Sequence, residues 1–247
     1  MRVSEKLRSL LCDTGSICVL TGAGISAESG VETFRGVNGL WSKLKPEELA
    51  NFDAFLRNPK LVWEWYNFRK NIIQNVKPNP AHHALSSLQN MVKDFTLVTQ
   101  NIDNLHLRAG SRDVIELHGN IERSYCVKCG RFADNVVVTE DKPVPHCVLC
   151  EGIIRPDVVW FGEMLPEGIF EKAMDAASRC ELFIIIGTSA VVYPAANLPL
   201  TAKRQGAYVV EINTEKTAIT DVVDESIIGK AGEILPEFVA IRENYKG

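Results

Sequence analysis

The chain has 247 residues, of which 46% are hydrophobic and 23% are charged, and its formal net charge is −4. Ordinary globular proteins have such a composition, so disordered and fibrous proteins are excluded. The acidic balance argues against a dedicated nucleic-acid-binding protein, because those usually carry a basic surplus. No apolar run approaches the roughly 20 residues of a membrane-spanning helix, and the first residues lack the apolar core of a signal peptide. We therefore expect a cytoplasmic protein.

Short apolar runs alternate with amphipathic patterns along most of the chain. A first helix is expected to end near Gly15, followed by strands at 16–21, 95–99, 114–117, 182–187 and 207–212. Further helices are expected at 81–91, 166–178 and 194–205. Strands that alternate with helices predict an α/β fold, with a parallel sheet covered by helices on both faces.

Two stretches interrupt this alternation. Residues 36–79 begin as a loop and continue as a helix at 61–73, and residues 122–154 hold four of the seven cysteines. We expect these two insertions to form a small domain, a helical part plus a zinc ribbon. Residues 1–35, 80–121 and 155–247 would then form a Rossmann-like domain.

A glycine-rich turn follows the first strand. Residues 22–27, GAGISA, fit G-x-G-x-x-[GA], in which the glycines allow a tight turn that lets backbone amides face a pyrophosphate. In a dehydrogenase the chain would continue to a second strand with an acidic end, but here a glycine-punctuated loop follows. The motif predicts a bound dinucleotide and disfavours hydride transfer. An ordinary strand-to-helix turn is the alternative.

Polar residues follow the other expected strands. Gln100, Asn101 and Asp103 can bind a ribose and a carboxamide, although Asp103 equally suits the N-cap of a helix. The segments 187–189 (GTS) and 213–215 (NTE) offer hydroxyl and amide groups, although both are also ordinary turn sequences. Because the carboxyl ends of parallel strands meet at one edge, we expect all of these segments to line one crevice.

Among the five histidines, His118 has the best position for catalysis, because it follows a strand at this edge. A histidine beside a cofactor suits a general base. His82, His83 and His106 lie in helical patterns, so we expect them to be packing or surface residues.

The cysteines form two CxxC pairs, Cys126 with Cys129 and Cys147 with Cys150. Their separation is typical of a zinc ribbon, in which four thiolates surround one structural ion and leave no open coordination position. Two redox CxxC motifs are the alternative. His146 adjoins a ligand, and we expect it to be a loop residue.

Taken in order, these motifs resemble those of the sirtuins, the NAD-dependent protein-lysine deacylases, over essentially the whole chain. One departure is Glu32, where the family commonly has proline. The matching segments are GAGISAESG (22–30), TFRG (33–36), TQNID (99–103), ELHG (116–119), both CxxC pairs, RPDVVWFGE (155–163), GTS (187–189), VVYPAA (191–196) and INTE (212–215).

The resemblance implies that NAD is a co-substrate and that one Zn²⁺ is structural. The acyl-lysine oxygen would attack the ribose as nicotinamide leaves, and His118 would accept a ribose hydroxyl proton, with Asn101 as the second catalytic residue. The products would be free lysine, nicotinamide and O-acyl-ADP-ribose. Val159, Phe161 and Gly162 would line the lysine tunnel. The implied NAD-binding residues are Gly22, Ala23, Gly24, Ser26, Ala27, Glu28, Phe34, Arg35, Trp41, Gln100, Asn101, Ile102, Asp103, Gly187, Thr188, Ser189, Asn213, Thr214, Glu215 and Ala231.

Tyr66 and Arg69 lie three residues apart, on one face of the expected helix. A phenol and a guanidinium in an apolar pocket can pair with a carboxylate at the acyl terminus. The pair resembles that of class III sirtuins, which remove succinyl, malonyl or glutaryl groups, and Ala50 is similar to the small residue that widens their pocket. The resemblance thus implies removal of acetyl and of succinyl or malonyl groups. A surface arginine on an amphipathic helix is the alternative.

Two other functions stay open. A mono-ADP-ribosyltransferase would share the cofactor and the pocket. A non-enzymatic zinc ribbon could bind nucleic acid, but only Arg123, Lys128 and Arg131 favour it, and the acidic charge opposes it. The expected partners are proteins or peptides with acylated lysine, with no membrane and no direct nucleic-acid contact.

Overall fold

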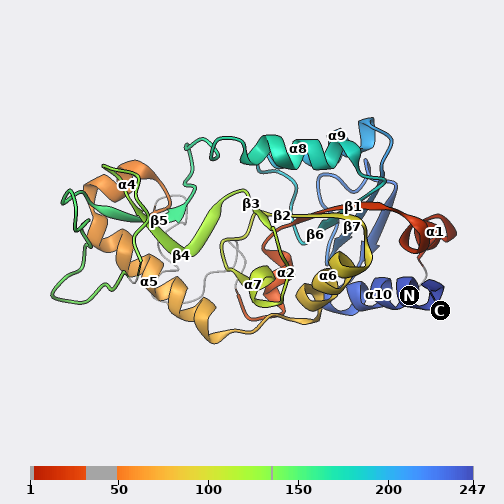
Figure 1. The fold of residues 1–247 in the computed structure, drawn as a ribbon, viewed down its shortest axis with the longest axis horizontal. Coiled ribbons are helices and arrows are strands. Elements are labelled where there is room, and N and C mark those ends of the chain that lie inside the picture. Colours follow the sequence, from red (N-terminus) through yellow and green to blue (C-terminus); the bar gives the residue numbers. More distant parts are fainter. Residues whose placement is uncertain (1–2, 32–48, 135, 247) are drawn as a thin grey trace.

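A computed structural model describes residues 3–31, 49–134 and 136–246 of the chain. Six parallel strands form its main sheet, in the order β3-β2-β1-β6-β7-β8 (Figure 1). The strands are β1 (Ser16–Thr21), β2 (Asp94–Thr99), β3 (Ile115–Glu116), β6 (Leu182–Ile186), β7 (Tyr208–Asn213) and β8 (Glu225–Ile228). All five predicted strands are found, and the parallel sheet is confirmed. β8 was not predicted, because it is short and lies at the edge of the sheet.

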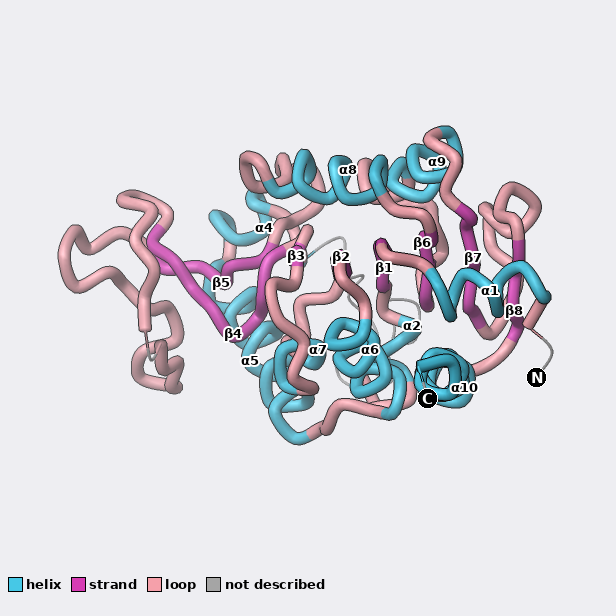
Figure 2. The backbone as a smooth tube through the Cα atoms, turned by 45° about the vertical axis from the view of Figure 1, so that its right-hand side comes forward, coloured by secondary structure: helices cyan, strands magenta, loops and turns pink. Residues whose placement is uncertain are grey.

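Helices cover both faces of this sheet, as predicted. α8 (Ile169–Arg179) and α9 (Asn197–Arg204) lie on one face, and α6 (Pro80–Met91) and α10 (Ala231–Lys246) lie on the other (Figure 2). α1 (Glu5–Asp13) packs against α10. Alternate residues of β1 point into the two apolar layers, Val19 toward α6 and α10 and Leu20 toward α8 and α9. Burial on both faces explains why the strands are continuous apolar runs.

A smaller part lies at the left of Figure 1. Its antiparallel sheet pairs β4 (Gly119–Cys126) with β5 (Ile154–Val158), beside α4 (Phe52–Arg57) and α5 (Pro59–Asn75). These elements share a separate apolar core that includes Phe55, Trp63 and Trp160. The sequence placed domain boundaries at 121/122 and 154/155, and β4 and β5 each run across one of them. The division into domains stays a prediction.

Local sequence determines where α5 begins. The Asn58 side chain accepts a hydrogen bond from the backbone N–H of Leu61 at 3.1 Å, and Pro59 occupies the first turn. The inner face buries Trp63, whose indole N–H donates to the carbonyl of Ile154 on β5 at 3.0 Å. The predicted helix is therefore found, docked on the small sheet. Among the described helices, none combines the length and the hydropathy required to cross a bilayer.

Candidate active site

The turns after β1 and β6 meet backbone to backbone. The N–H of Gly22 donates to the carbonyl of Ile186 at 2.9 Å, and the N–H of Gly24 donates to that of Gly187 at 2.7 Å. A Cβ on Gly24 would lie 2.7 Å from the Cα of Gly187, whose φ of +58° itself favours glycine. Larger residues would separate the two turns. The N–H groups of Gly22 and Gly24 already donate to backbone carbonyls of the protein. The N–H of Ala23 has no acceptor among the described residues.

A polar cluster lies beside this turn, after β2. Ser26 Oγ donates to Asp103 Oδ2 at 2.7 Å and accepts from Asn101 Nδ2 at 3.2 Å. Asn101 Nδ2 also donates to the carbonyl of Gly22 at 3.0 Å, which leaves Asn101 Oδ1 to accept from a ligand. The other oxygen of Asp103 accepts from the backbone N–H of Leu105 at 3.0 Å. Asp103 therefore bonds both to the polar cluster and to the first residue of the helix Leu105–Arg108, but the N-cap of that helix is Asn104, so the N-cap alternative is wrong.

Asp103 is buried, and burial raises the pKa of its carboxyl group, although the hydrogen bonds from Ser26 and Leu105 oppose this shift. The positive charge of Arg69, on α5, also lowers the pKa of Asp103. The small part and the main sheet thus both contribute to the electrostatics of this pocket.

The His118 ring has a defined tautomer. Its Nδ1 lies 2.9 Å from the backbone carbonyl of Gln100, and a carbonyl can only accept, so Nδ1 carries the proton. Nε2 is then left with a free lone pair. Burial lowers the pKa of His118 below its ordinary value of 6.5, although the bond to Gln100 opposes this shift. At neutral pH His118 is therefore an uncharged base.

The remaining segments of the crevice adjoin these groups. Gln100 Nε2 donates to Thr188 Oγ1 at 3.0 Å, and Asn213 Nδ2 donates to the carbonyl of Thr188 at 3.1 Å. The carboxyl ends of β1, β2, β6 and β7 thus bring residues 22–27, 100–103, 187–189 and 213–215 to one edge. Phe34, Arg35 and Trp41 lie outside the described residues.

Two predicted NAD-binding residues meet at the start of α10: Ala231 begins the helix, and the side chain of Glu28 contacts its first turn. Glu28 Oε1 accepts from the backbone N–H of Gly232 at 2.9 Å, so this carboxylate anchors the helix. The neighbouring Ala231 is 7% exposed. The sequence did not predict α10, because Pro236 lies within it and proline normally interrupts a helix.

The segment after β5 lies against His118. The N–H of Val159 donates to the carbonyl of His118 at 2.9 Å, and the N–H of Phe161 donates to that of Ala50 at 2.9 Å. The Phe161 side chain is 49% exposed, and Gly162 has a φ of +85°. The predicted tunnel residues therefore lie between His118 and Ala50.

A buried ion pair supports this segment. Arg155 is 3% exposed and forms a bidentate bridge to Glu163, whose Oε2 also accepts the backbone N–H of Trp160 at 2.8 Å. The guanidinium carbon lies 3.4 Å from the ring centre of Trp160. Stacking and pairing together satisfy a charge that would otherwise be costly to bury.

Tyr66 and Arg69 lie on the inner side of α5. The phenol oxygen accepts the indole N–H of Trp160 at 2.8 Å, and burial raises the pKa of Tyr66 to about 12. Tyr66 therefore stays neutral with its own O–H left to donate. The Arg69 guanidinium lies 4.9 Å from the ring centre of Trp65 and interacts electrostatically with Tyr66 and Asp103.

The four paired cysteines gather at one point. Their sulfur atoms all lie within 4.8 Å of one another, with Cys126 and Cys150 3.5 Å apart and Cys129 and Cys147 3.8 Å apart. A tetrahedron of about 2.3 Å zinc–sulfur bonds has edges of about 3.8 Å. Two separate redox pairs would not need all four sulfur atoms at one point, so this convergence favours the zinc site over the redox alternative.

The surroundings of the thiols also fit one structural zinc ion. The backbone N–H groups of Leu149 and Cys150 lower the pKa of Cys147 to about 7, toward the thiolate that a metal requires. A Cβ on Gly152 would lie 2.8 Å from the sulfur of Cys126, so only glycine leaves room there. His146 is exposed and its Nδ1 lies 3.1 Å from the carbonyl of Val144. The expectation of a loop residue is confirmed.

Comparison with known proteins identifies this arrangement. The Sir2 family matches residues 22–194, which include the glycine turn, the polar cluster, His118 and the four cysteines. The chain belongs to the Sir2 family. The sirtuin resemblance of the sequence motifs is thereby confirmed.

Several Sir2 relatives match nearly the whole chain. NAD-dependent protein deacylase 2 of Pyrobaculum aerophilum is 53% identical and covers 93% of this chain and 92% of its own. The NAD-dependent protein deacylase of Aquifex aeolicus is 49% identical and covers 93% and 97%. A solved Sir2 homologue in complex with NAD superposes with a TM-score of 0.93 at 44% identity, over 99% of this chain and 96% of that one.

Two histidines of this Sir2 protein lie directly behind the polar cluster. His82 Nε2 lies 3.5 Å from Ser26 Oγ, and His106 Nε2 lies 2.9 Å from Thr21 Oγ1. Their rings are 4.9 Å apart, and burial lowers the pKa of His82 to about 4 and that of His106 to about 3. Packing was predicted correctly, but the polar contacts were missed, because they join segments that are distant in sequence.

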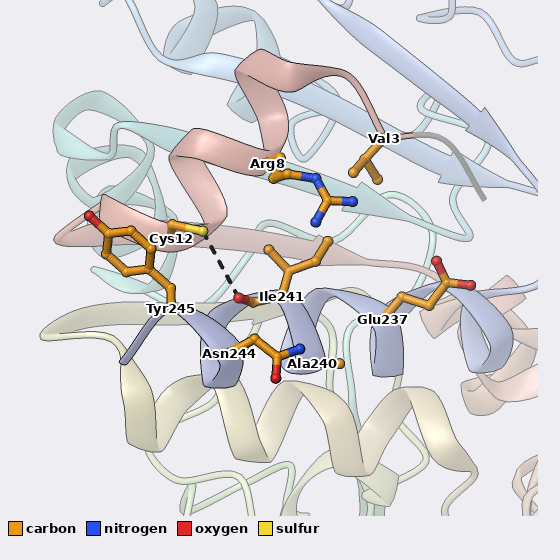
Figure 3. Close-up of a pocket in the computed structure, with 8 residues that line it drawn as sticks. All are labelled: Val3, Arg8, Cys12, Glu237, Ala240, Ile241, Asn244 and Tyr245. Atoms are coloured by element: carbon orange, nitrogen blue, oxygen red, sulfur yellow. Dashed lines mark hydrogen bonds between the residues drawn. The ribbon is translucent and has the colours of Figure 1, made fainter. Parts of the chain in front are cut away.

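A pocket of about 380 Å³ lies away from this edge, between α1 and α10 (Figure 3). Arg8, Cys12, Ile241 and Tyr245 are among its lining residues, and none of the predicted site residues lines it. The catalytic edge of the Sir2 fold is therefore defined by its polar groups and glycines, not by this hollow.

Proposed function

We propose that this chain removes acyl groups from protein lysines with NAD as its co-substrate, and that it accepts succinyl and malonyl groups as well as acetyl groups. The observation that carries the reaction is the fixed tautomer of His118, whose Nδ1 is bound to the carbonyl of Gln100 and whose Nε2 is therefore free to accept a proton. Sir2 relatives named NAD-dependent protein deacylases support the class. A related Sir2 mutant in complex with 2'-O-acetyl ADP ribose, at 44% identity, supports the expected product.

Each step of the reaction has a group in the chain to serve it. Asn101 and Asp103 hold the nicotinamide carboxamide, so that nicotinamide can leave as the acyl oxygen attacks the ribose carbon. His118 Nε2 then accepts a proton from a ribose hydroxyl, and this oxygen attacks the former acyl carbon. Addition of water to that carbon and cleavage of its bond to nitrogen release the lysine amine and leave the acyl group as an ester on ADP-ribose. Val159 and Phe161 guide the lysine toward the ribose. The chain thus supplies positioning and a base, while NAD supplies the leaving group.

The alternative reaction is mono-ADP-ribosyl transfer to another protein. Both reactions use the same nicotinamide pocket, but only deacylation needs an acyl-lysine to displace nicotinamide. We expect nicotinamide release from NAD to depend on an acetyl- or succinyl-lysine peptide, with O-acyl-ADP-ribose and free lysine peptide formed in equal amounts by mass spectrometry. Release without the acyl group, with ADP-ribose attached to protein, would establish the alternative reaction instead.

The acyl preference rests on Tyr66 and Arg69. The Tyr66 hydroxyl is oriented by Trp160, and the Arg69 guanidinium is near enough to interact with it electrostatically. A carboxylate is the group that accepts from a neutral phenol and a guanidinium together. Ala50 binds the backbone of Phe161 directly, so a small side chain stands beside the proposed tunnel and leaves room for a longer acyl chain.

Arg69→Met is expected to lower kcat/KM for a succinyl-lysine peptide by about 10- to 100-fold more than for the acetyl-lysine peptide, because only the succinyl group loses a charged hydrogen bond. The same peptide carrying each acyl group is compared at saturating NAD. Lys60→Met removes an exposed positive charge from the same helix and is expected to change neither value. An equal loss on both peptides would contradict the assignment.

Some expectations remain predictions. The acylated proteins that serve as substrates are defined here only by their lysine chemistry, and direct nucleic-acid binding is not expected. Arg123 favours this view, because it pairs with Glu116 at 2.7 Å and with Asp157 at 2.8 Å and so is engaged within the protein. A cytoplasmic location likewise remains a prediction from composition.

A further inference from the structure

We infer that His106 is a positioning residue of the nicotinamide pocket, which fixes the backbone of Asn101 through the hydroxyl groups of Thr21 and Thr99. The inference rests on the proposed function of that pocket. No motif assigned His106 a role, because it lies on α7 (Leu105–Arg108), behind the strands that carry the catalytic groups.

The hydrogen bonds that link these groups converge on the hydroxyl oxygen of Thr99. Thr21 Oγ1 donates to Thr99 Oγ1 at 2.8 Å, so its hydrogen is used and it must accept from His106 Nε2, 2.9 Å away. Thr99 Oγ1 also accepts the backbone N–H of Asn101 at 3.0 Å. His106 is therefore the Nε2–H tautomer and the first donor of a relay that ends at Thr99 Oγ1, the oxygen to which the Asn101 N–H also donates.

Asn101 is consequently held at two points. The relay holds its backbone, while the carbonyl of Gly22 and the hydroxyl of Ser26 hold its side-chain amide. Thr21 and Thr99 are 0% and 3% exposed, so bulk solvent does not reach their hydroxyl groups. Without His106 the Thr21 hydroxyl is free to turn, and the Thr99 oxygen that accepts the Asn101 N–H loses the bond that fixes its position.

The other ring nitrogen strengthens this inference. Among the described residues, His106 Nδ1 and Ser111 Oγ are the buried side-chain nitrogen or oxygen atoms that have no hydrogen-bond partner. An imidazole with one unsatisfied nitrogen is a poor choice for simple packing, since an apolar ring would fill the space without that loss. The pKa of about 3 agrees with a neutral ring, because protonation would place an N–H on the unsatisfied nitrogen.

The relay also reaches Asp103 through the helix. Asp103 accepts the N–H of Leu105, the first residue of α7, and His106 follows directly on the same turn. Any shift of α7 into space left by a smaller side chain at position 106 would carry Asp103 with it. His106 thereby supports both groups that hold the carboxamide.

The experiment compares ligands that differ only in nicotinamide. His106→Leu is expected to weaken NAD binding, measured by calorimetry without peptide, by about tenfold, and to leave ADP-ribose binding within about twofold. The concentration of free nicotinamide needed for half-inhibition of deacylation should rise by a similar factor, with the KM for acyl peptide unchanged. His106→Gln retains an N–H donor near the Nε2 position and is expected to restore much of the loss.

Two further variants serve as comparisons. Ser111→Ala removes the other unsatisfied polar atom and lies outside the relay, so it should leave all of these values unchanged. Thr21→Val interrupts the relay at the next link, and its effect should not add to that of His106→Leu.

The inference would be overturned if His106→Leu weakened the binding of NAD and of ADP-ribose equally. It would also be overturned if His106→Leu and Ser111→Ala gave the same affinities and the same inhibition by nicotinamide. Additive effects of Thr21→Val and His106→Leu on NAD affinity would also overturn it. This double-mutant comparison can be made even if one of the variants is less stable. Failure of the wild-type protein to release nicotinamide with an acyl peptide would instead reject the proposed function.

Discussion

His118→Ala is expected to lower kcat for deacylation by a factor of about 10² to 10⁴, the range over which general bases contribute. The Gln100 carbonyl fixes the Nδ1–H tautomer, so Nε2 is the atom that is lost as a base. The glycine turns and the polar cluster do not depend on the imidazole, so NAD binding should remain within about threefold, or about 0.7 kcal/mol.

The pH dependence gives an independent check on His118. Burial lowers its pKa below 6.5, and the active form is the unprotonated one. Activity should therefore be retained as the pH falls to 6.5 and be lost only as the pH falls through the lowered pKa. The residual activity of His118→Ala should lack this acid limb in a plot of kcat/KM against pH.

His83 provides the matched control, because it is an exposed histidine on α6. His83→Ala should retain both the rate and the acid limb. If His118→Ala retained more than about a tenth of the wild-type kcat, its contribution would fall below the factor of about 10² to 10⁴ that a general base supplies. Another group would then have to take the ribose proton.

Removing the metal is expected to unfold the small part and abolish activity together. Zinc-binding free energy is folding free energy in modules of this kind, on the order of 10 kcal/mol. Cys126 and Cys147 belong to the same buried core as Trp160, and Cys126 ends the strand that begins at Gly119, next to His118. Loss of the ion therefore removes the support for the catalytic base.

Cys129 allows this prediction to be tested without disturbing packing, because it is the exposed member of the four. Cys129→Ser should lower the zinc content from about one ion per chain and lower the Tm. Cys12→Ser, which changes a thiol outside the cluster, should alter neither. A Cys129→Ser protein that keeps its metal and its Tm would show that the thiolates do not hold a structural ion.

The sequence predicted most of the fold because its signals are local. Apolar runs identify the buried strands, and CxxC spacing alone brings two thiols together. The relay from His106 could not be predicted in this way, because Thr21, Thr99 and His106 become neighbours only when β1, β2 and α7 assemble. The same holds for Glu28, whose contact with Gly232 spans most of the chain.

The sequence also predicted which segments meet at the catalytic edge, since strand ends in a parallel sheet share one side. It did not predict how the groups divide their hydrogen bonds. Asp103 was left between an N-cap and a pocket role. In the fold the N-cap of α7 is Asn104, and Asp103 accepts from Ser26 with one oxygen and from the Leu105 N–H with the other. Tyr66 was assigned from its spacing to Arg69, but its hydroxyl is oriented by Trp160, which no helical pattern connects to it.

The hydrogen bond from Val159 N–H to the carbonyl of His118 has a consequence for motion. It continues the β4–β5 ladder, so the wall of the lysine tunnel and the base are linked by backbone. Any rigid movement of the small sheet would therefore carry both as one body and preserve their separation. Such a movement would change the distance between this body and the glycine turns after β1 and β6.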